Sequence, residues 1–154
     1  MIHSSDRDGA RWLRMESGKV QALDLELVMD LRAAIGAARA DDAPPVVLTG
    51  TGTSFSAGVD LFRVVREGEP YVSRFLPALA DLLLDLFTYP GPLVTAINGH
   101  AVAGGALIAW CGDLRVMADG KGRIGVPELR VGVPFPAVAI EILRLAAAAC
   151  GRHR

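Results

Sequence analysis

Cysteine is scarce in this sequence, and so are several other features that would point to particular classes of protein. The two cysteines, Cys111 and Cys150, provide neither a disulfide framework nor a Cys-x-x-Cys metal site. Aromatic residues make up 6% of the chain and are not interleaved with Lys or Arg, and a formal charge of −1 gives no basic surface for nucleic acid. No segment reaches the ~18 consecutive apolar residues of a membrane span, and residues 1–8 contain no apolar signal core. We therefore expect a cytoplasmic protein with no metal site, no nucleic-acid partner and no membrane span.

The residues that are present predict one α/β domain over residues 1–154. A chain of 154 residues with 51% hydrophobic and 21% charged residues is long enough and apolar enough to bury a core. Strand-like and helical segments alternate along it, which favours an α/β fold with right-handed crossovers. The expected strands are 11–14, 18–20, 46–50, 93–97 and 113–117, and the expected helices start at Asp24 and cover 77–87, 104–111 and 136–148.

Capping and apolar spacing support the first two helices. Asp24 stands where it can cap a helix that ends before the prolines of 41–45. In the second helix Pro77 is expected in the first turn, where proline is tolerated. The charged segment 62–70 between them predicts a surface loop. The apolar faces predicted for the two helices are Leu25, Val28, Met29, Leu31 and Ile35, and Leu79, Leu82, Leu83 and Leu86.

Two glycine-containing segments, 53–61 and 98–106, are the strongest signals for function. Each follows a strand-like apolar run, Val46-Val47-Leu48 or Leu93-Val94-Thr95-Ala96-Ile97. Glycine leaves main-chain N–H groups open to a ligand, and two such donors aimed at one point can bind an oxygen that becomes negative during a reaction. An isolated glycine pair more often only shapes a turn, so the pairing of the two segments carries the prediction.

These segments resemble the crotonase superfamily, the enoyl-CoA hydratase/isomerase family. Its first signature is similar to Phe55-Ser56-Ala57-Gly58-Val59-Asp60-Leu61, and its second to Asn98-Gly99, Gly104-Gly105 and Cys111-Gly112-Asp113. A third block is similar to Gly125-Val126-Pro127-Glu128 followed by Gly132. The blocks occur in family order over residues 10–145. The resemblance implies a spiral of stacked ββα units, here without the C-terminal helices that the family usually has, and a homo-oligomer such as a trimer.

The resemblance also implies roles for individual residues. Glu128 matches the position of the family's catalytic acid/base, and its apolar neighbours disfavour the ionised form of a carboxyl group, which suits proton exchange. Val59 and Gly104 would give their backbone N–H groups to the thioester oxygen of an acyl-CoA substrate. The residues expected to bind the substrate are Ala57, Gly58, Asp60, Leu61 and Gly105. Asp60 could equally be a helix N-cap, and Glu128 could be a solvent-facing loop residue.

Leu107 distinguishes two reactions within the family. The family's hydratases carry a second glutamate at the corresponding position, and Leu107 supplies no carboxylate. One acid/base can still move a proton between two carbons, so the expected activity is the shift of a double bond from Δ3 to Δ2 in an enoyl-CoA. The alternatives are an enoyl-CoA hydratase, or a non-catalytic homologue that binds acyl-CoA or a longer family member. Coenzyme A is expected as part of the substrate, with no other cofactor.

Three further features receive a structural interpretation. His100 lies in a turn where the family is variable. The segment Thr49-Gly50-Thr51-Gly52-Thr53 lacks the Gly-Lys-Ser/Thr ending of a phosphate-binding loop. Gln21 stands where the family often has asparagine, and we interpret that change as structural.

Overall fold

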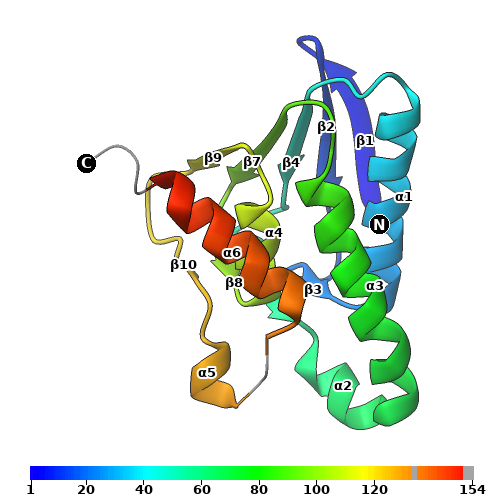
Figure 1. Cartoon of the computed structure of the whole chain (residues 1–154), viewed down its shortest axis with the longest axis vertical. Coiled ribbons are helices and arrows are strands. Elements are labelled where there is room, and N and C mark those ends of the chain that lie inside the picture. The colour runs from blue at the N-terminus through cyan, green and yellow to red at the C-terminus, as the bar shows by residue number, and fades with distance from the viewer. Residues whose placement is uncertain (133–134, 151–154) are drawn as a thin grey trace.

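A five-stranded sheet is the frame of the molecule (Figure 1). The computed structural model describes residues 1–132 and 135–150. The first two strands form an antiparallel hairpin. The third strand pairs in parallel with the second, and each of the next two pairs in parallel with the strand before it. The strands, in spatial order, are β1 (Ile2–Arg7), β2 (Ala10–Met15), β4 (Val46–Thr49), β7 (Leu93–Ile97) and β9 (Leu114–Met117).

Short strands continue the chain beyond the ends of β4 and β7 and bring the two glycine segments together. One small sheet has the order β10 (Ile124–Gly125), β8 (His100–Val102) and β5 (Ser54–Ser56), and a two-stranded sheet pairs β3 (Ala22–Leu23) with β6 (Gly58–Val59). Both are parallel. The segment after β4 and the segment after β7 are therefore neighbours, although about fifty residues separate them in the chain.

Helices pack together beside the sheet. α3 contacts α1 on one side and α4 and α6 on the other, and α6 also contacts α4 (Figure 1). Their apolar sides, with the buried faces of β2, β4 and β7, make one hydrophobic core. The helices are α1 (Leu25–Ala40), α2 (Leu61–Glu67), α3 (Glu69–Phe87), α4 (Gly104–Trp110), α5 (Glu128–Val131) and α6 (Ala137–Cys150).

The first predicted helix is confirmed, with a correction to its buried face. Asp24 is the N-cap of α1, and its Oδ1 accepts a hydrogen bond from Leu27 N–H at 2.8 Å. Met29 is 48% exposed, whereas Leu27 is buried. The apolar face is thus rotated from the predicted one, because Leu27 and Leu31 are four residues apart and share one side of the helix.

The predicted surface loop over 62–70 is wrong. This segment forms α2 and the start of α3, separated by Gly68. Asp60 caps α2, and the Arg63 side chain bonds Glu67 one turn later. No residue of α2 is buried, so capping and ion pairing stabilise this short helix more than core packing does.

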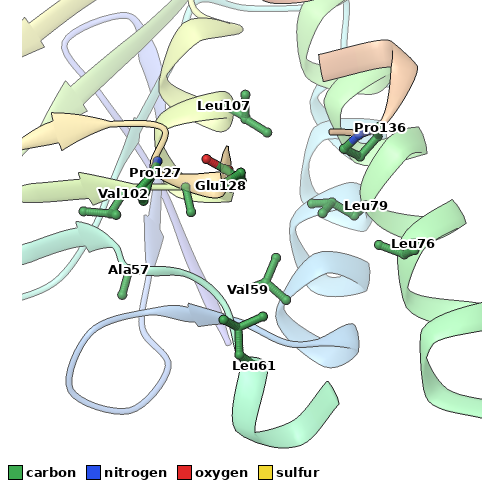
Figure 2. A pocket seen from close by; sticks show the side chains of 12 residues that line it. Ala57, Val59, Leu61, Leu76, Leu79, Val102, Leu107, Pro127, Glu128 and Pro136 are labelled. Carbon is green, nitrogen blue, oxygen red and sulfur yellow. The ribbon is translucent and has the colours of Figure 1, made fainter. Parts of the chain in front are cut away.

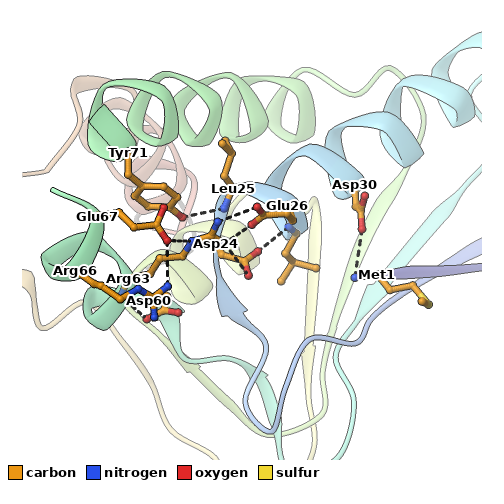
Figure 3. Close-up of polar contacts among 11 residues, drawn as sticks. Met1, Asp24, Leu25, Glu26, Asp30, Asp60, Arg63, Arg66, Glu67 and Tyr71 are labelled. Atoms are coloured by element: carbon orange, nitrogen blue, oxygen red, sulfur yellow. Dashed lines mark hydrogen bonds and ion pairs between the residues drawn. The ribbon is translucent and has the colours of Figure 1, made fainter. Parts of the chain in front are cut away.

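Arg63 also ties α2 to the start of α1 (Figure 3). Its guanidinium bonds both carboxylate oxygens of Glu26, which lowers the pKa of Glu26. It also lies 4.9 Å from the centre of the Tyr71 ring. The Tyr71 hydroxyl in turn accepts a hydrogen bond from Leu25 N–H at 2.9 Å. These contacts hold the segment that follows β6 against the rest of the domain.

Three other boundaries differ from the prediction. Pro77 lies inside α3, and the proline of the first turn is Pro70. Residues 18–20 form a turn instead of a strand, and the hairpin strand β1 has no counterpart in the prediction. The predicted Leu79, Leu82, Leu83 and Leu86 are all buried in α3, as expected.

Helix α6 matches the predicted helix 136–148 closely. Ile142 is buried beside α3 and α4, whereas Ile140 is 46% and Leu145 is 56% exposed. Within the described residues, no helix is both long and apolar enough to span a membrane.

Candidate active site

An apolar pocket of about 210 Å³ lies where the two glycine segments meet α3, α4 and α5 (Figure 2). β6 and the start of α4 form one side, and leucines of α3 form the opposite side. The lining residues are Ala57, Val59, Leu61, Leu76, Leu79, Val102, Ala103, Gly104, Leu107, Pro127, Glu128 and Pro136.

The backbone of β6 directs the Val59 N–H away from β3. Val59 pairs with Leu23, and the N–H of the next residue, Asp60, donates to the Leu23 carbonyl at 3.0 Å. N–H groups of successive residues in an extended strand point in opposite directions. The Val59 N–H therefore points away from β3, and Val59 itself lines the pocket.

Gly104 supplies a second N–H at the pocket. It is the first residue of α4, and the first N–H groups of a helix have no acceptor within the helix. The N–H groups of Ala106 and Leu107 both reach the Ala103 carbonyl. Across the described parts of the chain, the Gly104 N–H makes no backbone hydrogen bond.

The segments that carry these two N–H groups are in direct contact because Gly58 has no side chain. A Cβ at Gly58 would lie 2.7 Å from the Val102 oxygen and 3.0 Å from the Gly104 nitrogen, and Gly58 has a φ of +84°. Ala103, just before Gly104, has φ 52° and ψ −126°, which are the angles of the first central residue of a type II′ turn. This turn sets the direction of the Gly104 N–H.

Glu128 is the acidic group of the pocket. It is the first residue of α5 and is 7% exposed, and its side chain lines the pocket between Pro127 and Leu107 (Figure 2). Its Oε2 has no hydrogen-bond partner in the part of the chain that the structure describes. A buried carboxylate oxygen without a partner is unusual, since buried polar groups are nearly always paired. Among the lining residues Glu128 has the only ionisable side chain.

The apolar surroundings of Glu128 come from other elements as well as from its own segment. Pro127 lines the pocket, but Val126 is 38% exposed. Leu107 of α4 is 3% exposed and provides an apolar surface beside the carboxylate. The apolar neighbours of Glu128 in the sequence also include Leu129, Val131 and Val133, whose side chains lie outside the described residues.

The structure separates the predicted substrate-binding residues into two groups. Ala57 and Leu61 line the pocket, whereas Gly58, Asp60 and Gly105 lie behind the lining. Asp60 Oδ1 accepts a hydrogen bond from Arg63 N–H at 3.0 Å, so it is the N-cap of α2. A Cβ at Gly105 would lie 2.4 Å from the Ser56 carbonyl oxygen, so this glycine permits α4 to pack closely on β5.

Sequence reasoning did not identify the wall of the pocket opposite β6. Leu76, Leu79 and Pro136 form it (Figure 2). The heptad-like spacing of α3 marked Leu79 only as a core residue. Nothing in the local sequence indicates that residues 76 and 136 face a pocket together, because their proximity depends on how α3 and α6 pack.

Other reactive groups lie outside the pocket. His100 is half-buried in β8 and is not a lining residue. Burial raises the pKa of the Cys111 thiol to about 12, so this cysteine stays protonated at neutral pH. Among the described residues no group of three or more His, Cys, Asp and Glu side chains could hold a metal ion.

Comparison with known proteins decides the family. Residues 12–148 match the enoyl-CoA hydratase/isomerase family. The chain belongs to this family. Its fold also matches that of solved family structures, with the mixed α/β architecture shared over nearly the whole chain.

Family members with different names are similar to this chain. A Thermus thermophilus protein named "Putative enoyl-CoA hydratase" is 40% identical over 79% of this chain and 49% of its own length. Mouse mitochondrial enoyl-CoA delta isomerase 1 is 31% identical over 88% of this chain and 48% of its own. The structure of a Mycobacterium tuberculosis enoyl-CoA isomerase is 36% identical, with a TM-score of 0.83 over 94% of this chain and 62% of that one. The chain thus spans about half the length of these curated family members.

Proposed function

We propose that this protein is an enoyl-CoA isomerase that shifts a double bond from Δ3 to Δ2 in an acyl-CoA thioester. The observation that carries the proposal is that Glu128 supplies the only carboxylate among the described residues that line the pocket. Leu107 also lines the pocket, and by the family resemblance it stands where the hydratases have a second glutamate. One acid/base is sufficient to move a proton between two carbons, whereas addition of water is assisted by two carboxylates.

The proposed reaction has two proton transfers at one residue. The Glu128 carboxylate removes a proton from C2 of the 3-enoyl thioester, and the electrons of that C–H bond delocalise into the thioester as a dienolate. The protonated Glu128 then returns the proton to C4, so the double bond lies between C2 and C3 and the carboxylate is restored. The Oε2 without a protein partner is free to contact the substrate.

The N–H groups of Val59 and Gly104 would stabilise the dienolate. In this proposal each donates to the thioester oxygen, which becomes negative when C2 loses its proton. Removing one such donor costs about 2.7–4 kcal/mol of barrier in a typical enzyme. The reaction needs no cofactor besides the coenzyme A of the substrate itself.

The acyl chain would lie against the leucines of the pocket. Leu61, Leu76 and Leu79 are all lining residues, and they offer an apolar surface next to the reacting carbons. An aliphatic 3-enoyl chain is complementary to this surface, because no polar side chain other than Glu128 lines the described pocket.

Hydration is the second candidate, because the Thermus thermophilus relative carries the name of a hydratase. It would require water to be held without a carboxylate at position 107.

Two parallel assays test the proposal. With a 3-enoyl-CoA, isomerisation raises absorbance at the band of the conjugated 2-enoyl thioester. With a 2-enoyl-CoA, hydration lowers the same band. We expect turnover in the first assay that exceeds turnover in the second. Faster hydration would assign a hydratase, and acyl-CoA binding without turnover in either assay would identify a non-catalytic homologue.

A further inference from the structure

A buried serine, Ser56, lies between the two segments that carry the proposed N–H donors. It is the last residue of β5 and is fully buried. Its hydroxyl donates to the Gln21 carbonyl at 2.8 Å and accepts the Gly58 N–H at 3.1 Å. We call this pair of hydrogen bonds the Ser56 clamp. It fixes the main chain one residue before Val59.

The acceptor of the clamp is itself held firmly. Gln21 is 1% exposed and has a φ of +48°, a conformation that costs free energy for a residue with a side chain. Its Nε2 donates to the Thr51 carbonyl at 2.6 Å, and the neighbouring Val20 carbonyl accepts the Ala57 N–H at 2.9 Å. Residues 20–21 therefore hold the chain on both sides of Ser56.

The other side of Ser56 supports the start of α4. A Cβ at Gly105 would lie 2.4 Å from the Ser56 carbonyl oxygen and 2.7 Å from the Ser56 Cβ, so the first turn of α4 packs directly on this serine. Gly104, which lines the pocket, is the preceding residue. One buried residue thus contacts both the β6 segment and the first turn of α4.

We propose that Ser56 is a positioning residue that holds the Val59 and Gly104 N–H groups at the separation required to bind one oxygen. The proposal rests on the proposed function of these two groups. Glycine has more backbone conformations open to it than other residues, so the chain between Ser56 and Val59 needs an anchor. The Ser56 hydroxyl accepts the Gly58 N–H and thereby fixes the peptide between Ala57 and Gly58, from which the φ and ψ of Gly58 orient the Val59 N–H.

Ser56→Ala should therefore weaken transition-state stabilisation more than substrate binding. Misplacement of catalytic groups by about 1 Å can cost on the order of a hundredfold in rate. We expect kcat to fall about tenfold to a hundredfold while KM changes by less than about threefold. Ser54→Ala is the matched control, because Ser54 is a buried serine of the same strand that takes no part in the clamp.

A spectroscopic measurement separates this proposal from the proposed reaction. A conjugated 2-enoyl thioester absorbs at longer wavelength when its carbonyl oxygen accepts strong hydrogen bonds, and this shift needs no proton transfer. We expect the bound 2-enoyl-CoA to show the shift in the unmodified protein, in Ser54→Ala and in Glu128→Gln. Ser56→Ala should lose at least half of it, and Ser56→Cys, which keeps a weaker donor and acceptor, should retain an intermediate value.

Each result of this experiment is decisive. A full shift in folded Ser56→Ala would overturn the clamp and leave the proposed function intact. If Ser56→Ala does not fold, Ser56→Cys gives the answer, since a full shift there with a reduced hydrogen-bonding group would also overturn the clamp. No shift in the unmodified protein would show that Val59 and Gly104 do not bind the thioester oxygen, and would overturn both proposals. A shift without isomerase turnover would retain the clamp and reject only the reaction.

Discussion

The residues that line the pocket differ from those directly behind them in what their polar groups do. We compare three lining residues, Val59, Gly104 and Glu128, with two supporting residues, Asp60 and Gly105. Asp60 bonds the backbone of α2, and Gly105 packs on the main chain of Ser56. Glu128 Oε2 and the Gly104 N–H have no partner in the described parts of the chain.

Proximity to the site and a role in its chemistry are therefore separate properties of a residue. Val59 and Asp60 are adjacent in one glycine segment, and Gly104 and Gly105 are adjacent in the other. The lining residues keep an unsatisfied polar group next to a space that a ligand can fill. The supporting residues stabilise the fold, Asp60 through the hydrogen bond of its carboxylate and Gly105 through the close packing that its lack of a side chain permits. Substitutions should therefore affect activity in the first group and stability in the second.

The largest effect is expected for Glu128→Gln. The amide has nearly the same shape but cannot carry the proton, so isomerase turnover should fall by about 10²–10⁴-fold or more. The thermal unfolding midpoint should stay the same or rise, because the buried carboxylate oxygen is unpartnered. Turnover measured with a 3-enoyl-CoA, together with thermal unfolding, checks this. Retention of more than about a tenth of the rate would move the acid/base to another residue.

The next effect is expected for Gly104→Pro, which removes the N–H at the start of α4. Proline is otherwise acceptable in the first turn of a helix. The rate should fall about 10²–10³-fold, the cost of one oxyanion donor. Gly104→Ala is the control, since it keeps the N–H and its Cβ would meet only the end of the flexible Leu23 side chain, at 2.9 Å. Equal losses in the two variants would mean that the shape of the backbone, and not hydrogen-bond donation, explains the role of Gly104.

Gly105→Ala should mainly lower stability. The added Cβ would lie 2.4 Å from the Ser56 carbonyl oxygen, a backbone atom that cannot move aside alone. Overpacking of this kind costs about 1–3 kcal/mol. Chemical denaturation gives the free energy of unfolding directly. A variant as stable as the parent would place Gly105 outside the supporting group.

The smallest effect is expected for Asp60→Ala, which removes the N-cap of α2. The expected loss is about 1 kcal/mol of stability with little change in turnover. Asp60→Asn should restore most of the stability, because asparagine is an equally good cap. If Asp60→Asn instead lost turnover at unchanged stability, the charge of Asp60 would belong to the substrate site after all.

The sequence predicts the elements whose signals are local. Strand 93–97 is confirmed residue for residue as β7, because its apolar run reports burial in the centre of a sheet. Asp24 is confirmed as a cap, since the acceptor and donor are three residues apart. Helix α2 could not be found in this way. Its apolar residues Phe62 and Val65 are 91% and 83% exposed, so they do not mark a face that packs on the core.

The candidate site is predictable only in part for a similar reason. The family resemblance indicates Glu128, Val59 and Gly104, and the structure places all three around one pocket. The division between Gly104 and Gly105 depends on which one rests on Ser56, and that contact joins residues 49 positions apart. Leu76 and Pro136 likewise meet only through the packing of α3 and α6. Contacts between residues so far apart cannot be predicted from the local sequence pattern.

The strained backbone at Ala103 has a consequence for the evolution of this pocket. Its φ of 52° and ψ of −126° are angles that glycine adopts readily and alanine does not. Strain of this kind typically costs on the order of 1–3 kcal/mol. A glycine would remove the cost, but it would also allow the peptide before Gly104 to turn. The alanine methyl narrows the conformations open to this turn, so the chain trades some stability for a rigid orientation of the N–H that follows.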